Sequence, residues 1–326
     1  MLRKIDWDSQ VGRRLRLRDL HVFFTVAQQG SMGRAAAQLG VSAPTVSEVI
    51  ADLEDGIGVR LFDRGKQGVE VTAYGRALLK RTINVFDELK QSIKDIEYLA
   101  DAGTGELRIG CPDSIATTLL LHIVRRFSKK YPRVALHVDA VPFPATEFPR
   151  LRDRTYDLIL IRWLPRHREE HSPDDLNVEF LFDDPLIVAA APHSWLARRR
   201  KIDFADLADA PWLLPADTWT YALLAEAFRE RRLAAPKVRL VTMSVQIRAD
   251  LLADGECVTM FPTSVANHYG LRALQVDFPV RRWPVAIVTL RNRSLSPVAE
   301  RFIECAREVT KSRTSPSASG AKRTRG

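Results

Sequence analysis

The sequence predicts an N-terminal winged helix-turn-helix, then one long helix, then an α/β domain. Three observations support this order. Residues 31–50 carry the spacing of two short helices joined by a tight turn. Residues 73–102 contain no proline and a single glycine, which permits one continuous helix. From Leu107 onward, apolar strand-like segments alternate with helical patterns, and this alternation is typical of parallel α/β layers.

The helix-turn-helix prediction rests on residues 31–50. The apolar residues of the first helix share one face at spacings of three and four: Ala35, Ala36 and Leu39. Gly40 is expected to end this helix, because a residue without a Cβ tolerates a positive φ. Ser42 is suited to cap the second helix and Pro44 to its first turn. An ordinary helical hairpin is the alternative for this segment taken alone.

The flanking segments favour a winged helix-turn-helix. Residues 17–30 carry the pattern of an amphipathic helix that ends at Gly30. Two short strands are predicted at 59–62 and 69–71, with a polar, glycine-containing tip between them. Three helices followed by a β-ribbon define this fold.

The order of these motifs resembles the LysR-type transcriptional regulators. From Leu17 the chain has L-R-x-L-x-x-F-x-x-V, then A-A-x-x-L-x-V-S-x-P-x-x-S, G-V-R-L-F-x-R and V-x-x-T-x-x-G, which ends at Gly75. The resemblance implies a DNA-binding transcriptional regulator that dimerises through its long helix. It also implies two C-terminal α/β subdomains like those of a type 2 periplasmic binding protein, between which the chain crosses twice and a small-molecule co-inducer binds.

Patterns and resemblance together set the expected boundaries. The parts are an N-terminal extension 1–14, a winged domain 15–72, a linker and dimerisation helix 73–102, an effector-binding domain 105–312 (subdomain I about 105–181 and 293–312, subdomain II about 182–292) and a disordered basic tail 313–326. Strands are predicted at 107–111, 134–139, 157–162, 186–191, 258–261 and 285–290. Helices are predicted at 115–131, 219–232, 244–254 and 297–311. Residues 103–107 are expected to form a hinge.

Composition excludes several classes of protein. Hydrophobic content of 46% and charged content of 27% are ordinary globular values. No apolar run approaches the ~18 residues of a membrane span, and the N-terminus lacks an apolar signal region. We expect a soluble, cytoplasmic protein. A solute-binding or enzymatic α/β protein with an incidental helical N-terminus is the alternative class.

The motifs of common enzyme and cofactor sites are missing from the sequence. It has no P-loop, no G-x-S-x-G and no H-E-x-x-H, and its seven histidines lack metal-ligand spacing. We therefore expect no catalysis, no cofactor and no metal. Cys111 and Cys257 are candidates for redox sensing, although a free cysteine is more often a small buried hydrophobe.

The net charge of +9 is not concentrated in the winged domain, since residues 1–104 hold 15 basic and 14 acidic residues. DNA affinity must then come from local placement of charge. The candidates for phosphate contacts are Arg34, Arg60, Arg64 and Lys66. The alternative for each of them is a solvated surface charge.

The start of the second helix supplies the candidate base-contacting residues. They are Ser42, Ala43, Pro44, Thr45, Ser47 and Glu48. Family members more commonly have S-Q-P-x-x-S-R-Q here, so this chain lacks a glutamine and an arginine that donate to purine edges. Glu48 can instead accept from a cytosine amine.

The expected partners follow from this geometry. Two recognition helices one DNA turn apart, ~34 Å, require a two-fold partner and an interrupted palindrome. We expect a homodimer and a homotetramer through the α/β lobes, double-stranded promoter DNA as partner, and RNA polymerase as a further partner of an activator. The apolar stripe of the linker helix supports pairing: Leu79, Ile83, Phe86, Leu89, Ile93, Ile96 and Leu99. Packing of this stripe on the chain's own C-terminal domain is the alternative.

Ligands of α/β folds bind at the carboxyl ends of strands, where helix N-termini present free N–H groups. The candidate effector residues at such places are Asp113, Ser114, Thr146, Arg162, Thr218, Trp219 and Ser244. Helix capping is the alternative for most of them, and a salt bridge at the crossover is the alternative for Arg162. An acid at Asp113, where many relatives have Ser or Thr, disfavours a simple anionic effector unless Arg162 dominates. A hydroxylated or amine-bearing ligand is favoured instead.

Overall fold

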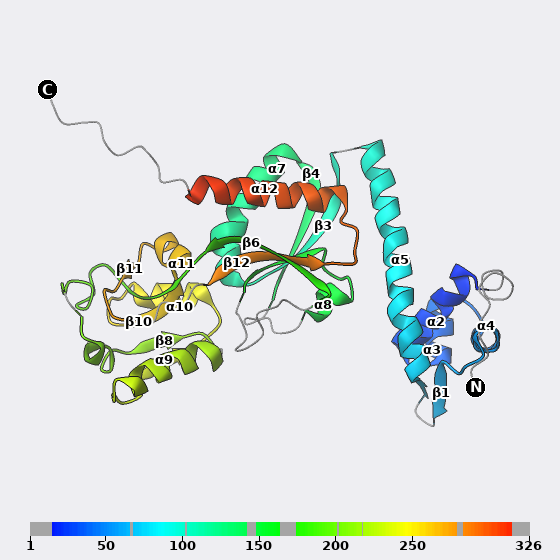
Figure 1. The fold of residues 1–326 in the computed structure, drawn as a ribbon, viewed down its shortest axis with the longest axis horizontal. Coiled ribbons are helices and arrows are strands. Elements are labelled where there is room, and N and C mark those ends of the chain that lie inside the picture. The colour runs from blue at the N-terminus through cyan, green and yellow to red at the C-terminus, as the bar shows by residue number, and fades with distance from the viewer. Residues whose placement is uncertain are drawn as a thin grey trace. The chain divides into compact units, whose positions relative to one another are not determined.

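The computed structural model describes residues 15–65, 68–101, 103–141, 148–163, 174–200, 202–216, 218–278 and 283–314. The chain divides into two compact units, Met1–Ile93 and Lys94–Gly326 (Figure 1). We call them the winged unit and the α/β unit. The predictions for the extension 1–14 and for most of the basic tail lie outside the described residues. The last helix continues through Thr314, two residues into the span predicted as the tail.

The winged unit has the predicted three helices and wing. Its elements are α2 (Leu17–Gln29), α3 (Met32–Leu39), α4 (Ala43–Ile57), β1 (Phe62–Gly65) and β2 (Gly68–Val71). Gly30 and Gly40 end α2 and α3 in the left-handed region, with φ of 60° and 67°. Apolar side chains from all three helices and the wing form one core, which includes Phe23, Val26, Ala35, Val46, Ile50 and Leu61.

The wing begins later than predicted, at Phe62 rather than residue 59. Glu54, on α4, accepts hydrogen bonds from the backbone N–H groups of Leu61 (2.6 Å) and Phe62 (3.0 Å). This carboxylate thus occupies the N–H groups of Leu61 and Phe62 at the start of the wing. β1 and β2 then pair antiparallel from Phe62 opposite Val71 to Gly65 opposite Gly68.

The linker helix α5 (Ala73–Ala100) starts where the sequence predicts. The Thr72 hydroxyl caps it by accepting from Gly75 N–H at 3.0 Å and donates to the Arg60 carbonyl at 2.8 Å. The predicted apolar stripe divides into a part that packs within the winged unit and a part that is exposed. Phe86 packs against the rings of His21 (5.8 Å) and Phe24 (6.2 Å), so this part serves the winged unit itself.

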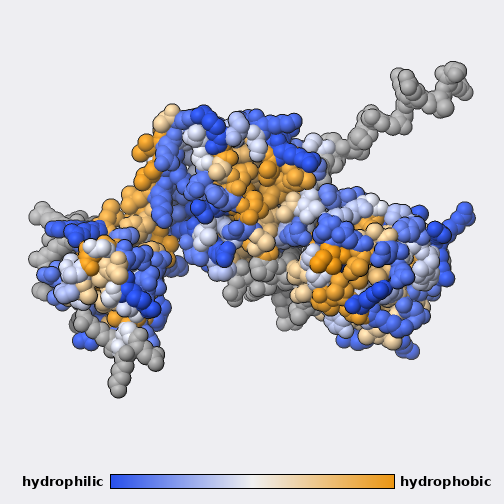
Figure 2. Space-filling view, turned by 180° about the vertical axis from the view of Figure 1, so that it is seen from behind, coloured by the Kyte–Doolittle hydropathy of each residue, from blue (hydrophilic) through white to orange (hydrophobic). Residues whose placement is uncertain are grey.

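The remainder of the stripe is exposed. Leu89, Ile93, Ile96 and Leu99 are 42%, 56%, 65% and 85% exposed in the single chain. Figure 2 shows apolar surface along this helix.

The α/β unit contains two five-stranded sheets. Lobe I has the order β4-β3-β5-β12-β6, with β3 (Thr104–Cys111), β4 (Arg133–Ala140), β5 (Leu158–Arg162), β6 (Leu176–Asp183) and β12 (Pro284–Leu290). Lobe II has the order β11-β7-β10-β8-β9, with β7 (Leu186–Ala190), β8 (Trp212–Leu214), β9 (Val238–Val241), β10 (Val258–Pro262) and β11 (Arg272–Ala273).

Helices complete each lobe. Lobe I has α6 (Asp113–Ile115), which continues through a π-helical turn (Ala116–Leu120) into α7 (Leu121–Lys130), and also α8 (Pro149–Arg152) and α12 (Pro297–Thr314). Lobe II has a 3-10 turn (Phe204–Leu207), α9 (Thr218–Glu230), α10 (Val245–Leu252) and α11 (Thr263–His268). Buried side chains of α7 and α12 pack on β3 and β5 in lobe I, and those of α9 pack around Trp212 in lobe II.

Three details of the predicted α/β domain are wrong. β12 belongs to lobe I, because it pairs antiparallel with both β5 and β6, so lobe II ends before residue 284. The sheets are mixed rather than parallel, since β7 also runs antiparallel to β10 and β11. The predicted hinge at 103–107 lies largely in β3, whose pairing with β4 begins at Thr104. The two crossings between the lobes run from β6 to β7 and from β11 to β12.

Two glycines of the winged unit allow a matched stability test. A Cβ on Gly75 would run into the carbonyl oxygen of Leu61 and come within 2.7 Å of a Val71 methyl group, whereas a Cβ on Gly56, inside α4, meets nothing within 4 Å. Gly75→Ala is expected to lower the free energy of unfolding by about 1–3 kcal/mol. Gly56→Ala is expected to raise it by about 0.5–1 kcal/mol. Urea unfolding measures both, and equal effects would contradict the close packing at Gly75.

Candidate nucleic-acid interface and ligand cleft

The N-terminal end of α4 is the most accessible part of the helix-turn-helix. Ser42, Ala43, Pro44 and Glu48 are exposed, and Thr45 and Ser47 are half-buried. The Ser42 hydroxyl accepts from Thr45 N–H at 3.3 Å and lies 2.8 Å from the Thr45 hydroxyl. Ser42 therefore caps α4, as its sequence position predicts, and this end of the helix is exposed.

The predicted phosphate contacts differ in how they are held. The guanidinium of Arg34 donates to the backbone carbonyl of Gln29 across the turn that follows α2, while the residue remains exposed. Arg60 is exposed beside the start of β1. Arg64 lies in β1 opposite Val69. The Arg64 side chain and Lys66 fall outside the described part of the chain.

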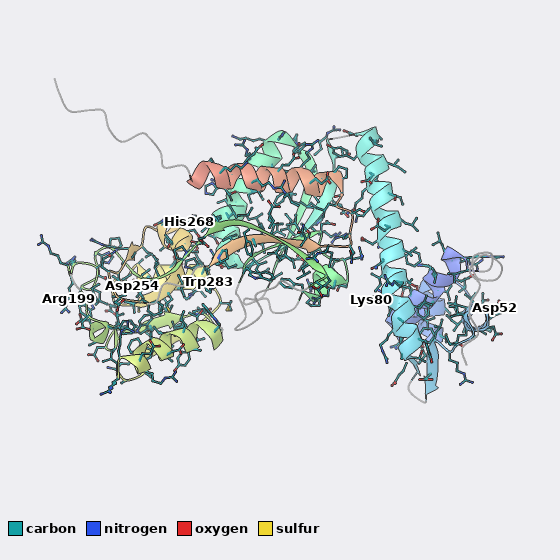
Figure 3. All side chains as sticks on the ribbon, in the orientation of Figure 1. Asp52, Lys80, Arg199, Asp254, His268 and Trp283 are labelled. Atoms are coloured by element: carbon teal, nitrogen blue, oxygen red, sulfur yellow. The ribbon has the colours of Figure 1, made fainter. Side chains whose placement is uncertain are left out.

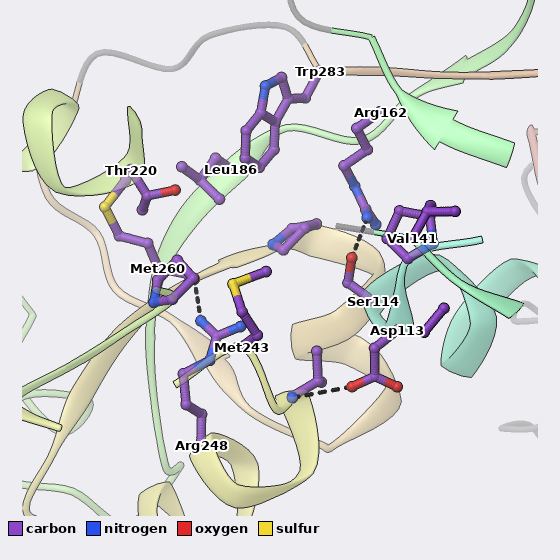
Figure 4. Close-up of a pocket in the computed structure, with 15 residues that line it drawn as sticks. Asp113, Ser114, Val141, Arg162, Leu186, Thr220, Met243, Arg248, Met260 and Trp283 are labelled. Carbon is purple, nitrogen blue, oxygen red and sulfur yellow. Dashed lines mark hydrogen bonds between the residues drawn. The ribbon is translucent and has the colours of Figure 1, made fainter. Parts of the chain in front are cut away.

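A cleft of about 400 Å³ lies between the two lobes (Figure 4). Most of its walls come from the carboxyl ends of strands and the residues that follow them. They include Pro112 and Asp113 after β3, Val141 after β4, Arg162 at the end of β5, and Pro215 after β8. The cleft thus lies at the strand ends where the sequence analysis places the effector site. The full lining is Pro112, Asp113, Ser114, Ala140, Val141, Arg162, Leu186, Pro215, Thr220, Met243, Val245, Arg248, Met260, Pro262 and Trp283.

Arg162, which lines the cleft, belongs to a buried ion pair. Arg162 donates to Asp184 at 2.6 Å, and both side chains are 2% exposed. Arg162 also donates to the Ser114 hydroxyl at 2.7 Å (Figure 4). Asp184 accepts from both the N–H (2.9 Å) and the hydroxyl (2.6 Å) of Ser264, the second residue of α11. The salt-bridge alternative for Arg162 is therefore correct, and the network joins residues of both lobes.

Asp113 makes a second contact between the lobes. Its carboxylate accepts from the backbone N–H of Val245 at 3.1 Å, and Val245 is the first residue of α10 (Figure 4). The sequence places Asp113 at the correct strand end. It does not reveal that the carboxylate is bonded to the opposite lobe.

The other predicted effector residues have mixed outcomes. Trp219 is half-buried and stacks on Trp283 with ring centroids 4.9 Å apart, and Trp283 itself lines the cleft beside β12 (Figures 3 and 4). Ser244 caps α10 by accepting from Ile247 N–H at 3.2 Å, so the capping alternative is correct for this residue. Thr218 begins α9. Thr146 and the side chain of Thr218 fall outside the described residues.

Sequence reasoning missed several lining residues. Arg248 is buried on α10, where its guanidinium carbon lies 4.4 Å from the ring centre of Phe261 and its Nη1 donates to the Met260 carbonyl at 3.4 Å. It stands one helical turn after Ser244, so the helical spacing could have found it. Met260 and Trp283 carry no comparable signal, because the sequence does not show that β10 and β12 border the same space.

The cysteines do not have the environment of a redox sensor. Cys111, Cys257 and Cys305 are free and buried. Burial raises the pKa of each thiol, and for Cys257 it outweighs the opposing effect of Arg239. A raised pKa leaves little of the reactive thiolate.

No group of three or more His, Cys, Asp or Glu side chains among the described residues is placed to hold a metal ion. Within the same part of the chain, no helix is long and apolar enough to cross a membrane.

A helix-turn-helix domain linked through a long helix to a two-lobed α/β domain with a ligand-sized cleft is the architecture of a ligand-responsive DNA-binding regulator. Two family models match the chain. Residues 17–76 match the bacterial regulatory helix-turn-helix protein, lysR family. Residues 100–311 match the LysR substrate binding domain.

Individual relatives agree with this assignment. The transcriptional regulator GbpR of Azospirillum brasilense is 26% identical over 91% of this chain and 87% of its own length. The SDS degradation transcriptional activation protein of a Pseudomonas strain is 29% identical over 87% of this chain and 93% of its own. The structure of full-length OxyR from Pseudomonas aeruginosa has a TM-score of 0.58 at 24% identity, covering 91% of this chain and 95% of that one, which supports the fold.

The chain belongs to the LysR family of bacterial transcriptional regulators: it is a DNA-binding regulator with a substrate-binding domain. The family match decides against a solute-binding protein with an incidental helical N-terminus.

Substitutions at the ion pair between Arg162 and Asp184 test how much it stabilises the α/β unit. Asp184→Ala leaves Arg162 buried without its carboxylate and is expected to lower the free energy of unfolding of the α/β unit by about 3–5 kcal/mol. The double variant Arg162→Met, Asp184→Leu is expected to lose less, because it leaves no buried charge.

Glu308→Ala is the matched control. It removes the partner of Arg126 in an ion pair whose side chains are 57% and 50% exposed, and is expected to cost less than about 1 kcal/mol. Denaturant unfolding measures all three. Equal losses for Asp184→Ala and Glu308→Ala would contradict the role of the buried pair.

Proposed function

We propose that this regulator contacts base edges through the N-terminal end of α4 and responds to a small molecule bound in the cleft between lobes I and II. The observation that carries the proposal is the exposure of Ser42, Ala43, Pro44 and Glu48 at the capped start of α4. A recognition helix enters the major groove by this end, and its side chains there reach the bases.

Arg34, Arg60 and Arg64 are proposed to contact phosphates. Such contacts position a protein on DNA without specifying its sequence. The hydrogen bond from Arg34 to Gln29 supports this role, because it presets the guanidinium beside the helix-turn-helix while the residue stays exposed. The overall charge balance of residues 1–104 is nearly neutral, so these few cations are the local source of phosphate affinity.

The protein is proposed to act as a homodimer through α5 and as a homotetramer through its α/β lobes. The exposed part of the helix supports the dimer: Leu89, Ile93 and Ile96 share one face at spacings of four and three. Paired helices would remove these side chains from water. Two recognition helices then require an interrupted palindrome with half-sites one DNA turn apart.

Effector binding in the cleft is proposed to change the DNA contacts of the paired winged units. A ligand can shift such an equilibrium only by its difference in affinity for the two states. DNA must then change the affinity for the effector by the same factor. An activating role would add RNA polymerase as a partner. We also propose that the protein acts in the cytoplasm and catalyses no reaction, in keeping with its DNA partner and with relatives named as regulators.

The DNA-binding proposal is tested with the full chain and a labelled duplex from the region upstream of its own gene. Fluorescence anisotropy should show tighter binding to this duplex than to a random one. Glu48→Ala is expected to reduce the preference for the correct base at one half-site position by about tenfold or more, because one base contact is worth about 1–3 kcal/mol.

Asp55→Ala is the control, because it removes the same charge from an exposed position near the far end of α4. It should leave the preference among operator variants unchanged. If Glu48→Ala changed the affinity for every operator variant by the same factor, base contact by Glu48 would be ruled out.

The dimer proposal predicts that Ile93→Asp yields monomers. This residue is exposed in the single chain, so the substitution should leave the monomer folded while placing a charge in the paired face. Lys80→Asp changes the charge by two units at an exposed position that helical periodicity puts on the opposite side of α5, and it should leave dimers intact. Size-exclusion chromatography with light scattering at micromolar concentration gives the mass. A monomeric wild-type protein would end this proposal.

A further inference from the structure

We propose that Asp113 is the built-in anion of the cleft and that it excludes anionic effectors in favour of uncharged, mainly apolar molecules. This inference rests on the proposed role of the cleft as the effector site. It commits to a class of ligand that differs from the polar effector favoured by the sequence alone, and it assigns the selection to one residue.

The first step is the contact that Asp113 already makes. Its carboxylate accepts from Val245 N–H at 3.1 Å, at the N-terminus of the eight-residue helix α10. A carboxylate is stabilised there by the backbone donor and by the helix dipole. The Ser244 hydroxyl meanwhile accepts from Ile247 N–H. The Asp113 carboxylate thus occupies the backbone donor at this helix terminus that an anionic ligand would otherwise use.

The second step is the balance of charge around the cleft. Two arginines line it, Arg162 and Arg248, and one of them is bonded to Asp184 at 2.6 Å. Asp113, an exposed residue, supplies a second carboxylate. Among the described residues, these four charged side chains at the cleft sum to zero when ionised. A carboxylate ligand would add an unmatched negative charge to a region where Arg162, Asp184 and Arg248 are all buried, which is unfavourable.

The third step is the character of the walls. Ten of the fifteen lining residues have apolar side chains, among them Leu186, Met243, Met260 and Trp283. The Ser114 hydroxyl accepts from Arg162, and its own proton remains to be donated to a ligand. A cavity of about 400 Å³ accepts a small organic molecule. The matching ligand is uncharged, mainly hydrocarbon, and carries a hydrogen-bond acceptor such as a carbonyl or hydroxyl oxygen.

Benzamide and benzoate are suitable probes, because they have nearly the same size and differ in charge. Isothermal titration calorimetry with the full-length wild-type protein should show benzamide binding at least about tenfold tighter than benzoate. Asp113→Ala frees Val245 N–H and leaves the cleft with one excess positive charge. It should bind benzoate about tenfold tighter than the wild type does.

Three variants complete the design. Asp250→Ala removes an exposed carboxylate from the same helix and should leave benzoate affinity unchanged. Ser114→Trp fills the cavity and should abolish binding of both probes. If Asp113→Ala fails to fold, Asp113→Asn removes the charge and keeps an oxygen that accepts from Val245 N–H, and a smaller gain in benzoate affinity is expected.

The inference would be overturned if Asp113→Ala bound benzoate no more tightly than the wild type does. Asp113→Asn takes its place in this comparison if Asp113→Ala does not fold. The inference would also be overturned if neither the wild type nor any variant bound either probe. Wild-type binding of benzoate as tight as that of benzamide, abolished by Ser114→Trp, would overturn the exclusion of anions while keeping the cleft as the effector site. The operator assay measures the DNA-binding function independently of both outcomes.

Discussion

The ion pair between Arg162 and Asp184 is the interaction on which the two-lobed unit depends. Arg162 ends β5 of lobe I, and Asp184 stands between β6 and β7, where the chain first crosses to lobe II. Burying two charges is favourable only when each oxygen and N–H group has a partner. Ser114 and Ser264 supply such partners from the two lobes for the terminal nitrogens of Arg162 and for Asp184, whereas the buried Nε of Arg162 has no partner among the described residues. The pair therefore couples the position of one lobe to that of the other.

The same strand carries a second ion pair at its other end. Asp157, directly before β5, pairs with buried Arg293 at 3.0 Å and lies 3.8 Å from the ammonium group of Lys94 on α5. One short strand thus runs between the cleft and the end of the linker helix that belongs to the α/β unit. In the proposed mechanism, a ligand that displaced Arg162 would act on β5, and Asp157 at the opposite end of this strand contacts the linker helix.

The sequence predicted elements whose signals are local. Glycine stops, the serine cap at Ser42 and the threonine cap at Thr72 placed α3, α4 and α5 within a few residues, because each cap depends on its own segment. It did not predict short strands such as β8 and β11, which depend on partners far along the chain. β12 was assigned to the wrong subdomain for the same reason, since only its pairing with β5 and β6 shows where it belongs. The expectation that ligands bind at the carboxyl ends of strands led to Asp113, Ser114 and Arg162, which line the cleft. It could not show that Asp113 reaches the opposite lobe.

The most direct test of coupling between the cleft and DNA is a methylation-protection footprint, which reports guanines covered in the major groove. The wild type is expected to protect two clusters about 10 base pairs apart on its upstream region. The double variant Arg162→Met, Asp184→Leu removes the ion pair that joins the lobes without leaving a buried charge. It is expected to shift the spacing of the two protected clusters or their relative protection. Footprints and affinities that coincide for the two proteins would contradict the claim that contacts between the lobes control DNA binding.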